Sequence, residues 1–171
     1  KSTEWLVKKY SITRLPSIPT LKALRNFKSE TTDKFSFIGF GDPILNKKNG
    51  NVRGIKILEN QTTSEVNFQQ IFNLSELPET ADEIRKIARY FNVDNKRVYL
   101  RERATETIVK NTDFSKSRFV AFATHGLTSG DIKGLIEPAL VFTPPDKISD
   151  IDDGLLRASE ITKLKINADL I

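Results

Sequence analysis

The sequence has no cysteine and no methionine, and only one histidine, among its 171 residues. Without cysteine, these residues contain no disulfide framework, thiolate zinc site or thiol nucleophile. One histidine also cannot build a three-histidine zinc site. No apolar run approaches the roughly 18 residues of a membrane span, so we do not expect the chain to cross a bilayer. Because a reading frame begins with methionine, we expect the start to have been processed or left out and the chain to be a piece of a longer protein.

The signatures of several cofactor and hydrolase classes are also missing. There is no Walker A loop and no G-x-S-x-G nucleophile elbow, which argues against a P-loop nucleotide site and a serine hydrolase. Gly39-Phe40-Gly41 follows an apolar run, like the start of a dinucleotide fingerprint, but Pro43 interrupts it and Ile44 replaces the third glycine. We therefore expect no cofactor and no bound metal.

The composition that is present indicates one globular domain. Hydrophobic residues make up 38% and charged residues 29%, and 171 residues suffice for a single domain with a core. The net charge of +5 comes from 27 basic and 22 acidic residues. The basic residues are scattered and lack interleaved aromatics, which favours a solvated surface over a nucleic-acid footprint. The apolar start, 5–7, runs at once into Lys8-Lys9 and is no secretory signal, so a cytoplasmic location is expected.

Short apolar runs alternate with helical patterns, which predicts an α/β fold with a mainly parallel sheet. Segments 35–40, 97–100, 118–124 and 168–171 are predicted to share this sheet, and the near-continuous apolar run 118–124 indicates a strand buried on both faces. A polar loop around 47–51 is predicted to be the most mobile internal segment. Further strands are expected at 5–12 and 139–143, and further helices from Thr20, at 104–111 and within 155–164.

The clearest helix is predicted at 80–91, on one face of the sheet. Thr80 and Glu83 have the spacing of a capping box, and Asn92 is a suitable stop. Four apolar residues recur at the spacing of one helical face and should contact a core: Ile84, Ile87, Ala88 and Phe91.

His125 directly follows the predicted strand 118–124 and precedes Gly126. Ligands bind beyond the carboxyl ends of strands in open α/β sheets, so His125 could act as a general base and the Gly126 N–H as an oxyanion donor. Equally, the histidine could only hydrogen-bond a loop. A catalytic histidine should be partly accessible with one ring nitrogen free, whereas a core histidine should be closed on both. The other polar group, Asp150, Asp152 and Asp153, could bind a cation or a basic side chain, but we expect these carboxylates to be solvated.

Ten short motifs along the chain, in order and spacing, resemble the CHAT domain family of caspase-like cysteine peptidases. Each motif is weak by itself, and their order and spacing together carry the resemblance. One is A-T-H-G at 123–126. The others are a strand and turn at 10–17, a Leu-rich helix at 21–24, G-D-P at 41–43, L-P-x-T with a following Glu at 77–84, A-T-E at 104–106, a strand ending in P-P at 140–145, D-G-L-L at 153–156, A-S-E-I at 158–161 and N-A-D-L at 167–170.

This resemblance implies a caspase-like, mainly parallel sheet with helices on both faces, in which 1–171 form the N-terminal larger part of one domain and the C-terminal strands are missing. It implies a His–Cys dyad with His125 as the base and the Gly126 N–H as an oxyanion donor, while the cysteine follows Ile171, so the chain alone should be inactive. Asp153 is a candidate for substrate binding. The resemblance also implies a protein or peptide substrate, a bacterial source, and a longer protein with upstream helical repeats and an activating partner. Two alternatives stay open: a non-catalytic pseudo-peptidase that serves as an interaction module, and, ranked last, a nucleic-acid-binding domain.

Overall fold

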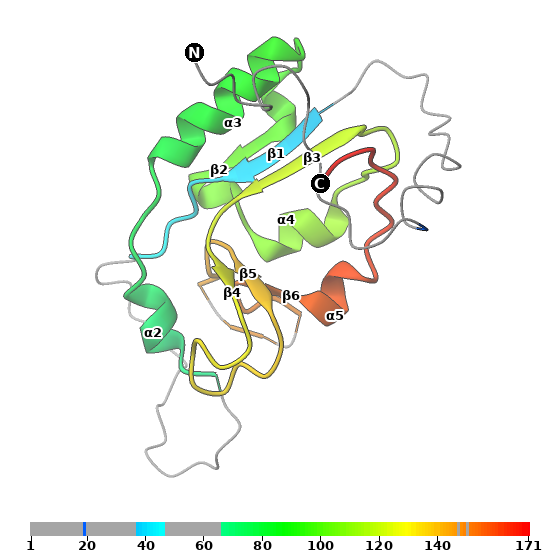
Figure 1. Ribbon diagram of the computed structural model, residues 1–171. Helices are drawn as coiled ribbons and strands as arrows, with labels where there is room; N and C mark the ends of the chain where they lie inside the picture. The colour runs from blue at the N-terminus through cyan, green and yellow to red at the C-terminus, as the bar shows by residue number, and fades with distance from the viewer. Residues whose placement is uncertain (1–18, 20–36, 47–65, 147, 150) are drawn as a thin grey trace, which may run out of the picture. The chain divides into compact units, whose positions relative to one another are not determined.

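The computed structural model describes residues 19, 37–46, 66–146, 148–149 and 151–171. The chain divides into two units, Lys1–Glu30 and Thr31–Ile171. Only Pro19 is described in the first unit, so the following description concerns the second (Figure 1). The predicted strand 5–12, the helix from Thr20 and the loop 47–51 lie outside the described residues.

A parallel sheet forms the centre of this unit. It contains β1 (Phe37–Gly41), β2 (Val98–Leu100) and β3 (Phe119–Ala123) in the order β2-β1-β3. Leu170 makes a parallel bridge to Phe119 and accepts a hydrogen bond from the Val120 N–H at 3.0 Å. Three of the four segments predicted to share one parallel sheet therefore form its strands, and the fourth, 168–171, joins it only through the bridge at Leu170.

The sheet is covered on both faces because successive side chains of a strand point to opposite sides. On one face Phe37 packs against α3 (Glu79–Tyr90), and on the other Ile38 and Phe40 pack against α4 (Glu106–Asn111) (Figure 1). Both faces of β3 are likewise packed, although only Val120 is fully buried. The apolar pattern of 118–124 therefore correctly predicted a strand that is packed on both faces of the sheet.

Helix α3 packs closely on β1 at a glycine. A Cβ atom at Gly39 would lie 2.6 Å from Cγ2 of Ile84, which is shorter than any ordinary contact. Ile84 and Ala88 are buried, and Ile87 and Phe91 pack at the margin of the same cluster. The predicted apolar face of this helix is confirmed.

The predicted capping box of this helix is wrong. The helix begins one residue earlier, at Glu79, and its N-cap, Pro78, offers no side-chain cap. The Thr80 hydroxyl instead donates to the Leu77 carbonyl at 2.7 Å and accepts from the Asp42 N–H at 2.8 Å. The Thr80 hydroxyl, which the sequence pattern assigned to capping, therefore makes a tertiary hydrogen bond to the residue that follows β1. The predicted stop holds, since Asn92 has the left-handed φ of 52°.

A small antiparallel sheet lies beyond the main one, with the order β4-β5-β6. Its strands are β4 (Gly126–Leu127), β5 (Ala139–Val141) and β6 (Leu155–Arg157), and α5 (Ala158–Ile161) follows directly. The sequence predicted the strand at 139–143 but neither of its partners. It also missed the short helix α2 (Phe68–Phe72), whose Ile71 packs in the core beneath this sheet.

The remaining described elements are two single 3-10 turns, η2 (Asn95–Arg97) and η3 (Arg101–Arg103), on either side of β2. In the described part of the chain, none of the helices combines the length and the apolar character needed to span a bilayer.

Candidate active site

The carboxyl ends of the three parallel strands meet at one edge of the sheet. Gly41 of β1 is in register with Leu100 of β2 and with Ala123 of β3. The residues that follow these strands therefore line one edge, where open α/β sheets bind their ligands. They are Asp42 after β1, Arg101 after β2, and Thr124 with His125 after β3.

His125 is partly buried at this edge and is held by one ring nitrogen. Its Nε2 lies 2.7 Å from the carbonyl oxygen of Ser75, in the segment between α2 and α3. A carbonyl oxygen only accepts hydrogen bonds, so Nε2 carries a proton and, in the neutral ring, Nδ1 carries the lone pair. Nδ1 has no hydrogen-bond partner among the described residues. The ring is thus oriented through Nε2, and no described residue takes up the lone pair of Nδ1.

The backbone around His125 joins the two sheets. The His125 carbonyl accepts a hydrogen bond from the Val141 N–H at 2.9 Å, and the Thr124 hydroxyl donates to the Val141 carbonyl. The chain leaves β3 and enters β4 at this point. These bonds to β5 fix the backbone on both sides of the imidazole's attachment point.

Gly126 is exposed and presents its N–H away from the small sheet. It faces Leu140 across the β4–β5 pair. Hydrogen-bonded and non-hydrogen-bonded pairs alternate along an antiparallel ladder. Since Val141 bonds to His125, the Gly126–Leu140 pair is of the non-hydrogen-bonded kind, and the Gly126 amide takes no part in the ladder. A Cβ atom on Gly126 would meet nothing closer than 3.9 Å.

The chain matches the family model for the CHAT domain over residues 1–171. It belongs to the CHAT domain family. No curated protein and no solved structure matches the chain. Membership makes this a domain related to caspase-like peptidases, and the parallel sheet with helices on both faces is compatible with that fold.

In this CHAT domain Asp153 forms an ion pair with Arg157, four residues further along the chain. Its Oδ2 lies 2.6 Å from Nη2 of Arg157, and its Oδ1 accepts from Nη1 of Arg157 at 3.1 Å and from the Leu155 N–H at 3.0 Å. A basic group of a substrate would have to compete with Arg157 for this carboxylate, which is only 13% exposed. The geometry of Asp153 therefore gives it a role in shaping the turn before β6.

The expectation that the acidic residues at 150–153 are solvated is wrong for two of them. Asp152 is buried and accepts hydrogen bonds from the N–H and the hydroxyl of Thr107, and Asp153 is bound to Arg157. Asp150 lies outside the described residues. Among the described residues, no group of three or more acidic or histidine side chains could hold a metal ion.

The sequence places Glu106 in the A-T-E motif but does not indicate that its side chain is buried, and this side chain organises the region. The carboxyl group is 1% exposed. Oε2 accepts hydrogen bonds from the N–H groups of Asp153 and Gly154 at 2.9 and 3.0 Å, and Oε1 lies 2.5 Å from Nζ of Lys110. Burial raises the pKa of Glu106 to about 7, although Lys110 and the Asp153 amide favour the charged form. The carboxyl group joins the start of α4 to the turn before β6.

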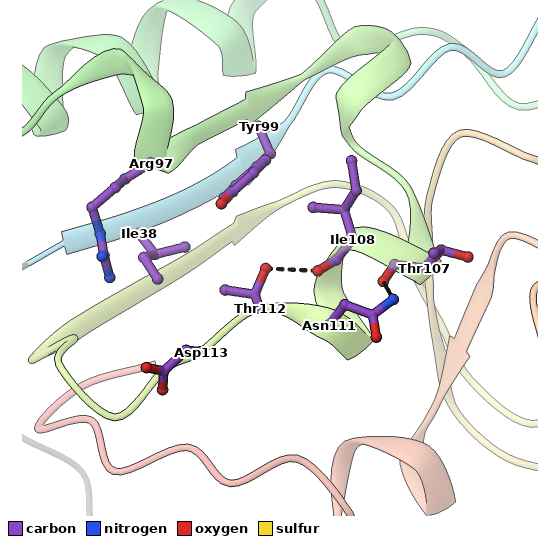
Figure 2. Close-up of a pocket in the computed structure, with 8 residues that line it drawn as sticks. All are labelled: Ile38, Arg97, Tyr99, Thr107, Ile108, Asn111, Thr112 and Asp113. Carbon is purple, nitrogen blue, oxygen red and sulfur yellow. Dashed lines mark hydrogen bonds between the residues drawn. The ribbon is translucent and has the colours of Figure 1, made fainter.

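A pocket of about 390 Å³ is lined by residues that include Ile38, near the amino end of β1, and Arg97, just before β2 (Figure 2). Two of its polar side chains donate hydrogen bonds to backbone carbonyls of α4. Asn111 donates to the Thr107 carbonyl, and the Thr112 hydroxyl donates to the Ile108 carbonyl. The pocket thus shares no residue with the carboxyl edge. Its lining comprises Ile38, Arg97, Tyr99, Thr107, Ile108, Asn111, Thr112 and Asp113.

Proposed function

We propose that this CHAT domain supplies the general base and one oxyanion donor of a cysteine endopeptidase. The observation that carries the proposal is the hydrogen bonding of His125 at the carboxyl edge of the sheet: Nε2 donates to the Ser75 carbonyl, while Nδ1 has no hydrogen-bond partner in the described part of the chain. A base that is anchored through one nitrogen and free at the other is prepared to accept a proton in a defined direction. Membership of a family related to caspase-like peptidases supports the same chemistry.

In the proposed reaction Nδ1 of His125 accepts the proton of a cysteine thiol, and the thiolate attacks the carbonyl carbon of a peptide bond. The bond from sulfur to carbon forms while the carbonyl oxygen becomes an oxyanion. The protonated imidazole then gives its proton to the departing amine as the C–N bond breaks, which leaves a thioester. Water activated by the same nitrogen hydrolyses the thioester and regenerates the thiol.

Gly126 is proposed to stabilise the oxyanion. Gly126 is an exposed residue that follows the base directly in the chain, and its N–H takes no part in the β4–β5 ladder. A backbone donor fixed before the reaction stabilises charge that develops in the transition state without further reorganisation. The absence of a side chain at Gly126 also leaves room for a substrate carbonyl.

The thiol must come from residues outside this sequence, because the 171 residues contain no cysteine. We therefore expect no peptide cleavage by the 171-residue chain alone. The tests below use the protein that carries this domain together with its thiol.

Replacing His125 with alanine or glutamine should reduce peptide cleavage by roughly 10³-fold or more, since removal of a general base abolishes activation of the thiol. Glutamine can still donate to the Ser75 carbonyl, so His125→Gln separates loss of the base from loss of the anchor. Both variants should melt within a few degrees of the unmodified protein. The measurement is kcat/KM on fluorogenic peptides together with the melting temperature. Cleavage at the original rate by either folded variant would remove the catalytic role of His125, and no cleavage by the unmodified protein would favour an interaction module.

Gly126→Pro should lower kcat by about 10²-fold because proline removes the proposed oxyanion donor. Gly126→Ala retains the N–H and finds open space for its methyl group, so it should keep most of the activity. Comparison of the two by single-turnover cleavage isolates the N–H from the side chain. Equal activity in both folded variants would show that another group binds the oxyanion.

A further inference from the structure

Two consecutive strand ends of the proposed active site carry charged residues in a backbone conformation that side chains disfavour. Asp42 has φ 46° and Arg101 has φ 54°. Left-handed backbone is uncommon outside glycine, because the Cβ atom of any other residue comes too close to the neighbouring carbonyl oxygen. The third described non-glycine residue of this kind, Asn92, ends a helix, where asparagine is usual. Strain of this kind concentrates at functional sites.

Hydrogen bonds hold both residues in this conformation. The Arg101 N–H donates to the Asp42 carbonyl at 3.0 Å, and the Arg101 carbonyl accepts from the Thr143 hydroxyl at 2.6 Å. The Asp42 N–H is bound by the Thr80 hydroxyl. The surrounding structure therefore determines where the Arg101 side chain leaves the backbone.

Two of the three guanidinium nitrogens of Arg101 donate to no described residue. Its Nη1 lies 3.4 Å from both carboxylate oxygens of Asp42, a long contact, and the other two nitrogens have no partner among the described residues. The Arg101 side chain is 43% exposed, whereas that of Asp42 is 4% exposed. A buried carboxylate behind an accessible guanidinium orients it and balances its charge while its outer donors stay free.

Two other arginines, Arg157 and Arg103, are engaged differently. Arg157 forms a two-pronged pair with Asp153, and the Arg103 guanidinium lies over the Tyr99 ring at 4.9 Å and donates to the Lys96 carbonyl. Arg101 alone among these three combines a position directly after a parallel strand with free donors.

We infer that Arg101 is a specificity-determining residue that binds the carboxylate of an aspartate or glutamate side chain in the substrate peptide. This inference rests on the proposed function. Arg101 follows β2 and His125 follows β3, on either side of β1, so two strand spacings of about 4.8 Å separate them, roughly 10 Å in all. An extended peptide advances about 3.3 Å per residue. In a peptide that extends along this edge, the acidic residue therefore lies within about three positions of the scissile bond.

The test compares kcat/KM for pairs of fluorogenic peptides that differ only by glutamate or glutamine at each of the three positions on either side of the cleaved bond. The protein that carries this domain and its thiol should prefer glutamate by about 10-fold or more at one position. Arg101→Gln should reduce cleavage of that glutamate peptide to the rate of its glutamine partner, and leave the glutamine peptide within about twofold. Arg103→Gln is the matched control and should keep the full preference.

Arg101→Lys is a second variant in case Arg101→Gln fails to fold. It keeps a positive charge beside the buried Asp42 but lacks the planar guanidinium of arginine. We expect it to melt near the unmodified protein and to show a reduced but measurable preference for glutamate. No preference in the unmodified protein, or an equal loss on both peptides in Arg101→Gln, would overturn the inference while leaving the proposed function in place. The absence of any His125-dependent cleavage would remove both.

Discussion

Ile84→Asp should lower the free energy of unfolding by about 4 kcal/mol or more, the largest loss expected from a single substitution in α3. Ile84 is 1% exposed and lies in the cluster with Phe37, Ala88 and Val98 between α3 and the sheet. The substitution removes a buried aliphatic side chain that fills the space beside Gly39. It places a carboxylate in the same apolar space. Urea denaturation followed by circular dichroism would measure this loss.

Two further substitutions calibrate the result. Ile136→Asp changes a residue that is 86% exposed and should leave the denaturation midpoint unchanged. Ile87→Asp should destabilise the domain by less than Ile84→Asp, because Ile87 is only partly buried at the margin of the cluster. If all three variants denatured at the same urea concentration, the packing of α3 on β1 would be wrong.

The free energy of unfolding should fall as the pH rises from about 4.5 to about 7, by an amount on the order of 3 kcal/mol, because of Glu106. Burial raises the folded-state pKa of this carboxyl to about 7, from an ordinary value of 4.5. Between these two values the folded state holds a proton that the unfolded state releases. The contribution of Glu106 is therefore complete below pH 4.5 and is lost as the pH rises through 7.

Glu106→Gln should remove this contribution, because glutamine stays neutral across the same range. The measurement is a series of urea denaturations from pH 4.5 to 8 on both proteins, and the difference between the two curves isolates Glu106 from other titrating groups. Glu102→Gln, at an exposed position of η3, is the matched control and should retain the original slope. Parallel curves for the unmodified protein and Glu106→Gln would mean that the pKa of Glu106 is not raised in the folded state.

The apolar pattern of the sequence was sufficient to predict the main sheet and its principal helix. Apolar residues that alternate in a strand, or recur every 3.6 residues in a helix, show which side of the element faces a core. This pattern can be seen within a short stretch of sequence. Residues 37–41, 119–123 and 79–90 therefore formed the predicted elements, and the position of His125 after its strand followed from them. The pairing of β4 and β6 with β5 could not be predicted, because strands of two and three residues are too short to show a period.

The partners of polar groups were not local and were decided by the tertiary structure. Thr80 had the sequence of a capping residue but bonds to Asp42, which is 38 residues away. Glu106 is bound to a turn nearly 50 residues further along the chain, and that contact buries a carboxyl group that helix propensity would place in water.

By itself the sequence determined the α/β architecture, the membership of the CHAT family and the placement of a lone histidine at the end of a buried strand. Only the tertiary structure decided that Nε2 of His125 is anchored to Ser75, that Asp153 is held by Arg157, and that the half-exposed Arg101 guanidinium lies beside the buried carboxylate of Asp42. The physical reason is that burial of apolar groups is non-directional and is recorded in the spacing of residues, whereas a hydrogen bond or ion pair needs two groups at a set distance and angle. Distance and angle exist only after the chain has folded.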